Sequence, residues 1–484
     1  MRKSSILLTS LTLLFSMIDL RAFAYDIAAE NEDGVTIYYN LINDGLELEV
    51  TKGENSYTGI VVIPSEVSSM KVTAIGEQAF YGCEKLESII FNENLKSIGG
   101  HAFSDCIGLT SVVFPQSLET ISAYAFTSCV KIKSITFGNN LTAIYDEAFY
   151  NCSSLESVVI PNSVKTLGPS VFESCNSLTS LTLGDGLTST GAGLARDCIA
   201  LSTVVLGKNV KTIGRRAFMG CTSLETLSIP NGVMSIGEQS FSGCSSLHTI
   251  SLPKTITDIG DKAFEDDVNL QNIISLITNP FNLKTTAFHP DVYDSATLYV
   301  PNGTKEKYMA KDGWSQFSNI IEGADQCAKP IIKYEKGKLQ FTSETEDVEF
   351  VSSITDYDIK EYASPEIELS VTYNVSVYAT KLGYANSETA TGTLCWIEVD
   401  PQAEGIETGV AEVRSVAVLI KSENGRMTVE GASDGTPISV YSTDGILLGS
   451  TVSRDRASAL NTNLPKGSVA VVKIGQKAVK VVVN

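Results

Sequence analysis

The sequence predicts a mainly β protein in which a repeat solenoid is followed by two small β-sandwich modules. The main observation is a period of 23 residues, kept by columns of cysteine, phenylalanine and leucine or isoleucine. The cysteine column has no slip and comprises Cys83, Cys106, Cys129, Cys152, Cys175, Cys198, Cys221 and Cys244. A fixed period of this length indicates one supersecondary unit stacked on copies of itself, so that equivalent side chains form ladders in a shared core.

Each repeat contains one short predicted strand. In the segment Leu86–Phe91 the first, fourth and sixth residues are apolar and point inward, and the three others point outward. This is the leucine-rich-repeat spacing, with one strand per coil. A Pro or Gly such as Pro115 then turns the chain, and a second apolar pair, here Leu118 and Ile121, lines the opposite wall. The predicted fold is therefore a leucine-rich-repeat solenoid.

The repeats resemble a known family through motifs such as Ile75-Gly76-Glu77-Gln78-Ala79-Phe80-Tyr81-Gly82-Cys83. They are similar to the BspA-like leucine-rich repeats of surface proteins from Gram-negative anaerobes, over about residues 60–322. The resemblance implies a non-catalytic role in adhesion and protein binding at the cell surface.

Both ends of the solenoid contain predicted caps, which a stack of coils requires if its last coils are not to expose the core. Residues 25–59 form the N-terminal cap, where the turn Asn43-Asp44-Gly45 separates two β runs. At the other end Asp267 replaces the cysteine, and Trp314 and Phe317 are expected to close the core. The solenoid with its C-terminal cap thus spans 60–322.

The N-terminus has the pattern of a secretory signal peptide. Arg2 and Lys3 precede an apolar stretch from Ile6 to Met17, and Ala22-Phe23-Ala24 fits a cleavage site. The apolar stretch is too short to span a membrane, and no transmembrane segment is expected after it. Residues 1–24 are therefore predicted to be removed, leaving a secreted or outer-surface protein.

The 23-residue period ends near residue 324, and β alternation replaces it. Residues 325–400 are predicted to form an immunoglobulin-like β module, followed by a linker at 401–413 and a β module at 414–484. The run Gly383-Tyr384-Ala385-Asn386-Ser387 looks like a module that often follows BspA-like repeats, which implies a spacer.

The C-terminal module resembles the sorting domains of the type IX secretion system. The resemblance rests on Ile438–Gly445, Leu464–Gly467 and Lys477–Val482, although Val469 stands where tyrosine is commoner. A further structural sandwich module is the alternative. Whether the module is cleaved after sorting does not follow from the sequence.

Composition argues against several functions. The net charge of −20 repels phosphate backbones, which disfavours a nucleic-acid partner. The three histidines, His101, His248 and His289, are scattered and supply neither a metal cluster nor a catalytic triad. No phosphate loop or dinucleotide fingerprint is present. We therefore expect no enzyme activity, no metal and no cofactor.

The repeat cysteines are expected to form a ladder of buried thiols. Neighbouring coils lie about 4.8 Å apart, whereas the Cβ atoms of a disulfide lie about 3.5–4.5 Å apart. Cys327 and Cys395 lie outside the repeats, and whether they pair stays open.

The candidate site is the outward face of the repeat strands, which we name the sheet face. Its residues are hydroxylic or modestly apolar, a type of exposed surface that marks contact sites, although strand propensity selects the same residues. The candidate partner-binding residues are Ser134, Thr136, Ser157, Val159, Ser180, Thr182, Thr203 and Val205. The predicted partner is a protein or a glycan. The oligomeric state does not follow from the sequence.

An alternative site is an edge patch of His101, Tyr124, Tyr145 and Tyr150, because rings suit sugar contacts. This patch would favour a glycan-binding accessory protein. A structural surface-coat component, which would assemble with itself, is a further alternative.

Overall fold

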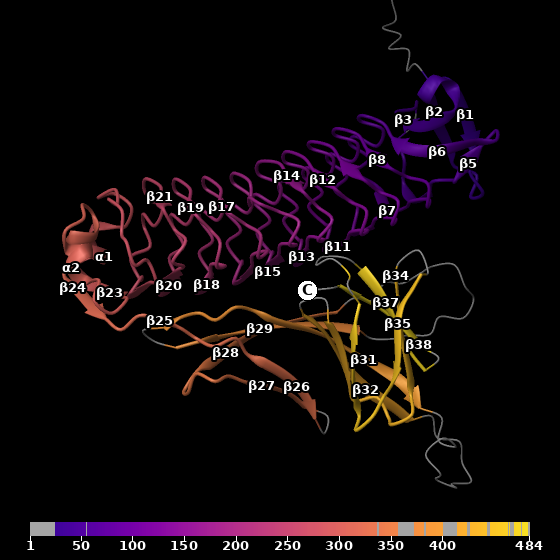
Figure 1. The fold of residues 1–484 in the computed structure, drawn as a ribbon. Coiled ribbons are helices and arrows are strands. Elements are labelled where there is room, and N and C mark those ends of the chain that lie inside the picture. The colour runs from indigo at the N-terminus through magenta and orange to yellow at the C-terminus, as the bar shows by residue number, and fades with distance from the viewer. Residues whose placement is uncertain are drawn as a thin grey trace, which may run out of the picture.

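The structure of the 484-residue chain is a computed structural model. It describes residues 25–356, 372–381, 384–399 and 414–482, with short gaps at 55, 336–337, 424–425, 443–445, 463, 465–468 and 476. The predicted signal peptide at 1–24 and the predicted linker at 401–413 lie outside the described residues. A long solenoid runs from the N-terminal cap to two short helices, and the C-terminal β modules lie along one of its sides (Figure 1).

The first wall of the solenoid, which carries the sheet face, is a ladder of short parallel strands. These strands are β4 (Gly59–Val62), β7 (Leu86–Ile90), β9 (Ser111–Val113), β11 (Ser134–Thr136), β13 (Ser157–Val159), β15 (Ser180–Thr182), β16 (Thr203–Val205), β18 (Thr226–Ser228), β20 (Thr249–Leu252) and β22 (Asn272–Ser275). Ser134 pairs with Ser111 on one side and Ser157 on the other. The register therefore follows the predicted period of 23 residues.

The second wall consists of two-residue strands. They are β8 (Ser97–Ile98), β10 (Thr120–Ile121), β12 (Ala143–Ile144), β14 (Thr166–Leu167), β17 (Thr212–Ile213), β19 (Ser235–Ile236) and β21 (Asp258–Ile259). Thr120 pairs in parallel with Ser97 and Ala143. Both walls thus stack in register, which confirms the predicted solenoid.

The core between the walls consists of the predicted ladders. The rings of Phe103 and Phe126 stack with centroids 4.8 Å apart and planes 6° apart, a separation equal to the usual strand spacing. Cys106 and Cys129 are fully buried beside them. Repetition of the same residue in each coil lets every side chain pack against its own copy.

Two turn positions in each coil have left-handed backbone geometry. The first column has φ between 53° and 61° and comprises Gln78, His101, Tyr124, Glu147, Ser170, Gly193, Arg216, Gln239 and Lys262. The second comprises Gly82, Asp105, Ser128, Asn151, Ser174, Asp197, Gly220, Gly243 and Asp266. Gly, Asn and Asp adopt this geometry most readily, which explains the composition of the second column.

The sixth coil is irregular. Thr190 replaces the apolar residue of the second wall and is buried, and its Oγ1 accepts a hydrogen bond from the Gly214 amide at 2.9 Å. The amide of Gly191 donates to Ser189 Oγ at 3.3 Å. In the regular coil before it, the Gly168 amide donates to the Ile144 carbonyl of the preceding coil. Side-chain oxygens thus replace backbone carbonyls at this point of the wall.

The N-terminal cap contains β1 (Ile27–Glu30), β2 (Thr36–Ile42), the 3-10 turn η1 (Asn43–Gly45) and β3 (Glu47–Thr51), and β5 (Glu66–Val67) and β6 (Met70–Ile75) follow it in the first coil. Strands β2 and β3 form the predicted antiparallel hairpin, and β3 pairs in parallel with β6. Because β6 pairs with β8, the cap continues directly into the second wall.

The C-terminal cap contains α1 (Pro290–Ser295), β23 (Thr297–Val300), α2 (Lys305–Met309), the 3-10 turn η2 (Trp314–Gln316) and β24 (Asn319–Glu322). Strands β23 and β24 extend the first wall in parallel. Trp314 is fully buried and Phe317 is 4% exposed, so these residues close the core as expected.

The C-terminal modules share one six-stranded sheet, in the order β28-β29-β31-β32-β33-β36. These strands are β28 (Glu349–Asp356), β29 (Thr372–Thr380), β31 (Ala390–Val399), β32 (Arg414–Glu423), β33 (Arg426–Glu430) and β36 (Ala457–Asn461). The predicted boundary between the modules falls between β31 and β32, which pair from Thr393 to Val399.

Two smaller sheets accompany this shared sheet, besides a two-stranded pair next to the solenoid. The hairpin of β26 (Ile331–Glu335) and β27 (Lys338–Thr342) contributes Ile332 to a core with Val375 and Leu394. The other sheet contains β34 (Pro437–Ser442), β35 (Leu447–Val452), β37 (Val469–Ile474) and β38 (Lys477–Val482). Strands β25 (Asp325–Gln326) and β30 (Tyr384–Ala385) pair in parallel beside the solenoid.

All ten cysteines are buried, and Cys327 forms no disulfide bond, so the possible bond to Cys395 is not formed in the structure. Within the described ranges, no helix has the length and apolar character needed to cross a membrane.

Candidate functional site

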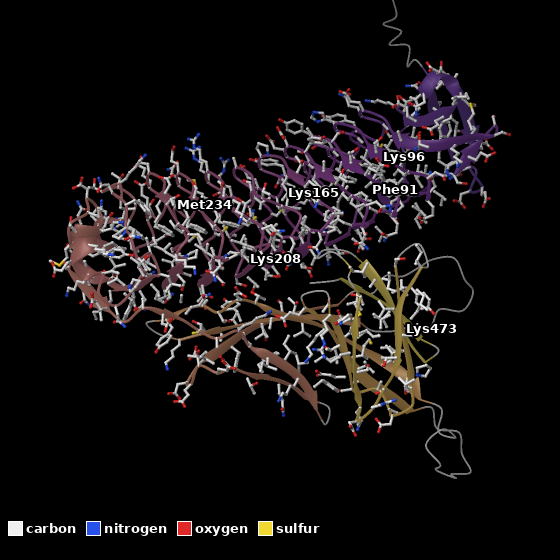
Figure 2. The ribbon with its side chains drawn as sticks, viewed as in Figure 1. Phe91, Lys96, Lys165, Lys208, Met234 and Lys473 are labelled. Carbon is white, nitrogen blue, oxygen red and sulfur yellow. The ribbon has the colours of Figure 1, made fainter. Side chains whose placement is uncertain are left out.

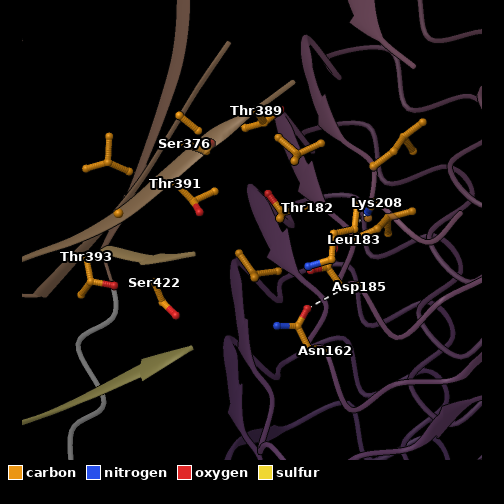
Figure 3. A pocket seen from close by; sticks show the side chains of 18 of the residues that line it. Asn162, Thr182, Leu183, Asp185, Lys208, Ser376, Thr389, Thr391, Thr393 and Ser422 are labelled. Carbon is orange, nitrogen blue, oxygen red and sulfur yellow. Dashed lines mark hydrogen bonds and ion pairs between the residues drawn. The ribbon is translucent and has the colours of Figure 1, made fainter. Parts of the chain in front are cut away.

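A large cleft lies between the sheet face of the solenoid and the C-terminal modules. Its volume is 1920 Å³. Thr182 and Asn162 lie on the solenoid wall, and Thr391 and Ser422 lie opposite them on the module wall (Figure 3). The cleft is thus a space between two β-sheet faces, each of which carries hydroxyl groups.

The predicted partner-binding residues form much of the solenoid wall. Seven of the eight line the cleft, namely Ser134, Thr136, Ser157, Val159, Ser180, Thr182 and Val205, and the adjacent Val204 lines it where Thr203 does not. Ser134 and Ser157 are exposed, Val159 and Thr182 are half-buried, and Ser251 further along the face is 5% exposed. The sheet face therefore becomes progressively more covered toward the C-terminal end of the solenoid.

The module wall was not predicted from the sequence. It includes Ser376 of β29, its cross-strand partner Thr391 of β31, and Ser422 of β32. Ser376 lies between two buried valines of β29, so strand alternation directs it away from the module core. That alternation could have identified the outward face, but not that this face is opposite the solenoid.

Three hydrogen bonds join the two walls at the end of the cleft near β18 and β20. The hydroxyls of Thr226 and Tyr378 are 3.2 Å apart. Asn231 Nδ2 donates to Gln326 Oε1 at 3.1 Å. The amide of Asn386 donates to Ser251 Oγ at 3.3 Å. The cleft is therefore closed at this end.

Six of the eight charged residues in the described lining form ion pairs with each other, and the other two, Arg426 and Glu388, are of opposite sign. Lys208 pairs with Asp185 on the solenoid wall, and Lys208 lies on the side that faces the modules (Figure 2). On the module wall, Lys329 pairs with Glu423 at 2.6 Å, and Lys421 pairs with Glu430 at 2.5 Å. Because these cations have local partners, the cleft lacks the one-sign patch that would attract a highly charged ligand.

Each wall also contains a buried hydroxyl without a hydrogen-bond partner among the described residues. These hydroxyls are Ser163 Oγ on the solenoid wall and Ser422 Oγ on the module wall. Ser422 is 6% exposed. Buried hydroxyls without partners are uncommon in folded proteins, but these two oxygens have almost no accessible surface, so a ligand in the cleft does not reach them without a rearrangement.

The alternative edge patch is only partly assembled. His101 and Tyr124 stack with ring centroids 4.7 Å apart and planes 2° apart. The Tyr124 hydroxyl donates to Glu147 Oε1 at 3.4 Å, and the nearby Glu147 carboxylate raises the pKa of Tyr124. Tyr145 is 43% exposed and Tyr150 is half-buried. Since the two stacked rings cover one face of each other, less flat surface remains for a sugar.

The other histidines have structural contacts. His289 caps α1 by accepting a hydrogen bond from the Asp291 amide at 3.2 Å. His248 Nδ1 contacts the carbonyl of Ser246. In the described part of the chain, no group of three or more His, Cys, Asp or Glu residues could hold a metal ion.

The stacked parallel coils, each with a strand of leucine-rich-repeat spacing, define a leucine-rich-repeat solenoid protein. The family described as BspA type Leucine rich repeat region matches residues 73–194 and 168–291. The repeat region of this chain, from residue 73 to residue 291, is thus similar to that family. No curated protein matches the chain significantly.

Several solved structures are similar to this chain. It is 33% identical to a leucine-rich repeat protein of T. pallidum, covering 39% of this chain and 87% of that one, with a TM-score of 0.37. It is 23% identical to a leucine-rich repeat protein from Bacteroides ovatus, covering 55% and 98%, with a TM-score of 0.34. It is 19% identical to a pneumococcal vaccine antigen, covering 61% and 98%, with a TM-score of 0.35.

Proposed function

We propose that this protein binds a macromolecular partner at the cell surface through its sheet face, in an adhesion-type role and without catalysing a reaction. The observation that carries the proposal is the cleft, because seven residues of the predicted sheet-face site line it. The BspA-type repeat region supports the same role, since proteins of this family are typically binding scaffolds of the cell surface.

The size of the cleft favours a macromolecule. Small-molecule sites usually enclose about 300–1,000 Å³, and this cleft encloses 1920 Å³. Serine and threonine hydroxyls can both donate and accept hydrogen bonds, while Val159 and Val205 add apolar area. Such a surface recognises its partner by shape and hydrogen bonding more than by charge.

The proposal includes export. Residues 1–24 act as a signal peptide, and residues 414–484 act as a sorting module of the type IX system. N-terminal sequencing of the protein recovered from the surface of a host with that system should begin at Tyr25. Intracellular retention of the full chain in such a host would contradict the proposed export.

The binding proposal can be tested with two matched double variants. Immobilised full-length protein is exposed to extracellular-matrix proteins and, in parallel, to a glycan array. Once a partner is confirmed, the double variant Val159→Asp with Thr182→Asp should bind that partner more than about tenfold more weakly than the wild type, because the new charges are desolvated inside the contact. Thr142→Asp with Lys165→Asp, both at exposed positions outside the cleft lining, should leave affinity unchanged. Equal binding by both variants would exclude the sheet face, and self-assembly without a foreign ligand would favour a structural coat.

A further inference from the structure

We infer that the shared C-terminal sheet is the second wall of the binding site and that the cleft holds an extended, weakly charged polypeptide segment. This inference rests on the proposed function. It adds Ser376, Thr391 and Ser422 to the site and assigns the chemistry of the partner.

The first argument is the geometry of the two walls. Three hydrogen bonds, among them the contact between Thr226 and Tyr378, join the walls at one end. Toward the other end Ser134 and Ser157 are exposed. Because the modules extend along the middle of the sheet face, a folded domain cannot lie flat on it, whereas a chain can enter lengthwise (Figure 1).

The second argument concerns hydrogen bonding. A sheet face presents side chains, because its backbone groups are already paired within the sheet. An extended polypeptide therefore cannot add here as a strand, and its amide and carbonyl groups need side-chain partners. Thr182 on one wall and Thr391 on the other point into the cleft (Figure 3).

The third argument separates a polypeptide from a glycan. Sugar sites usually present an exposed aromatic face. The aromatic residues in the described lining are Phe137, whose side chain is 7% exposed, and Tyr378, which is half-buried and bonded to Thr226. Aliphatic contact is available instead from Val159 and from Ile331, which is 47% exposed. This combination fits peptide side chains better than sugar rings.

The fourth argument concerns charge. Lys208, Lys329 and Lys421 each pair with a carboxylate of the same wall, and the two other charged residues of the described lining, Arg426 and Glu388, are of opposite sign. A strongly charged segment would have to compete with these pairs, so the favoured occupant has few charges.

The experiment uses the full-length protein and random dodecapeptides displayed on phage. Selected peptides are synthesised with a fluorescent label, and their affinity is measured by fluorescence polarisation. The module-wall variant is Ser376→Arg with Thr391→Arg, two cross-strand partners that line the cleft. The matched control is Thr342→Arg with Ser450→Arg, at exposed positions of the same modules outside the cleft. We expect the module-wall variant to weaken binding by more than about tenfold and the control to retain wild-type affinity, with equal melting temperatures.

The outcomes separate the inference from the proposed function. If Val159→Asp with Thr182→Asp removes binding but the module-wall variant does not, the sheet face binds alone and the second wall is excluded. If neither variant changes binding, both the inference and the sheet-face site are wrong. If no peptide is selected, but a neutral glycan binds the wild type and neither variant, both walls belong to the binding site. The assignment of the partner as a polypeptide is then overturned.

Discussion

The thiol of Cys106 donates a hydrogen bond to the carbonyl oxygen of Phe80 in the preceding coil, with 3.1 Å between Sγ and O. The same contact recurs between Cys129 and Phe103 at 3.1 Å and between Cys244 and Phe218 at 3.2 Å. Each repeat cysteine from the second onward thus links its coil to the coil before it. The cysteine column is both part of the apolar core and a ladder of hydrogen bonds.

This arrangement predicts inert thiols in the native protein. Burial raises the pKa of every repeat thiol, for example that of Cys198 to about 12, so the reactive thiolate is scarce at neutral pH. We expect slow alkylation of the folded protein, and alkylation of all eight repeat cysteines after unfolding without a reductant. Mass spectrometry measures both results. Recovery of linked peptides from adjacent repeats would contradict the prediction.

A second prediction concerns Asp267, which occupies the cysteine position after Cys244. Its side chain is fully buried, and neither carboxyl oxygen makes a hydrogen bond of ordinary geometry within the described residues. Burial raises its pKa to about 8. The unfolded state, with an ordinary Asp pKa of about 3.9, binds fewer protons between these two values. The free energy of unfolding should therefore decrease as pH rises from about 4 to 8, by up to about 1.4 kcal/mol per unit.

The test compares urea unfolding of the wild type with Asp267→Asn and Asp267→Cys across this pH range. Both substitutions remove the titrating group, and Asp267→Cys also restores the ladder thiol. We expect a flatter pH dependence in both variants and higher stability than wild type at pH 8. Parallel pH profiles for all three proteins would show that Asp267 titrates normally.

The sixth coil should be locally weaker than its neighbours. The amides of Gly191 and Gly214 bond to side-chain oxygens, whereas those of Gly168 and Gly237 bond to backbone carbonyls. Amides released by local opening exchange sooner. Hydrogen exchange followed by mass spectrometry should therefore be faster around Gly191 and Gly214 than at the two control glycines. Equal protection would show that Leu194, which is fully buried beside Ala195, restores the packing completely.

Contacts between neighbouring coils can be predicted from the sequence, whereas contacts between the solenoid and the C-terminal modules cannot. The register of Ser134 with Ser157 follows from the 23-residue period, because equivalent residues must stack. The contact between Thr226 and Tyr378 joins residues 152 positions apart, and no period connects them. An outward residue such as Ser376 has the same strand alternation whether it faces solvent or another module. The solenoid wall of the site was therefore predictable, and the module wall was not.

The turn columns show a second limit of the sequence. The column that contains His101 varies freely in composition, and this variation predicts an exposed surface position. The structure gives His101 a φ of 53° and stacks its half-buried ring on Tyr124. The residues of this column share a left-handed backbone conformation but not a side-chain type. Only Gly193 has a residue type that indicates this conformation from the sequence.

A further prediction is that the hydrogen bonds between the two walls fix the position of the C-terminal modules relative to the solenoid. Tyr378→Ala together with Gln326→Ala removes side chains from two of the three contacts. We expect the modules to move relative to the solenoid, which would increase the radius of gyration measured by small-angle X-ray scattering. Tyr441→Ala on β34, outside the cleft lining, is the control for loss of a tyrosine. An unchanged scattering profile in the double variant would show that the remaining contacts fix the arrangement.

The last prediction concerns salt. Because Lys208 and Asp185 neutralise each other on the solenoid wall, affinity for a weakly charged peptide should change by less than about threefold between low and near-molar salt. Lys208→Ala leaves the Asp185 carboxylate without this partner, so a peptide that carries one lysine should then bind more tightly at low salt than at high salt. Lys165→Ala, an exposed lysine outside the cleft lining, is the matched control and should leave the salt profile flat. Fluorescence polarisation over a salt series measures each profile. A steep loss of affinity with salt in the wild type would show that charge, rather than shape and hydrogen bonding, holds the partner in the cleft.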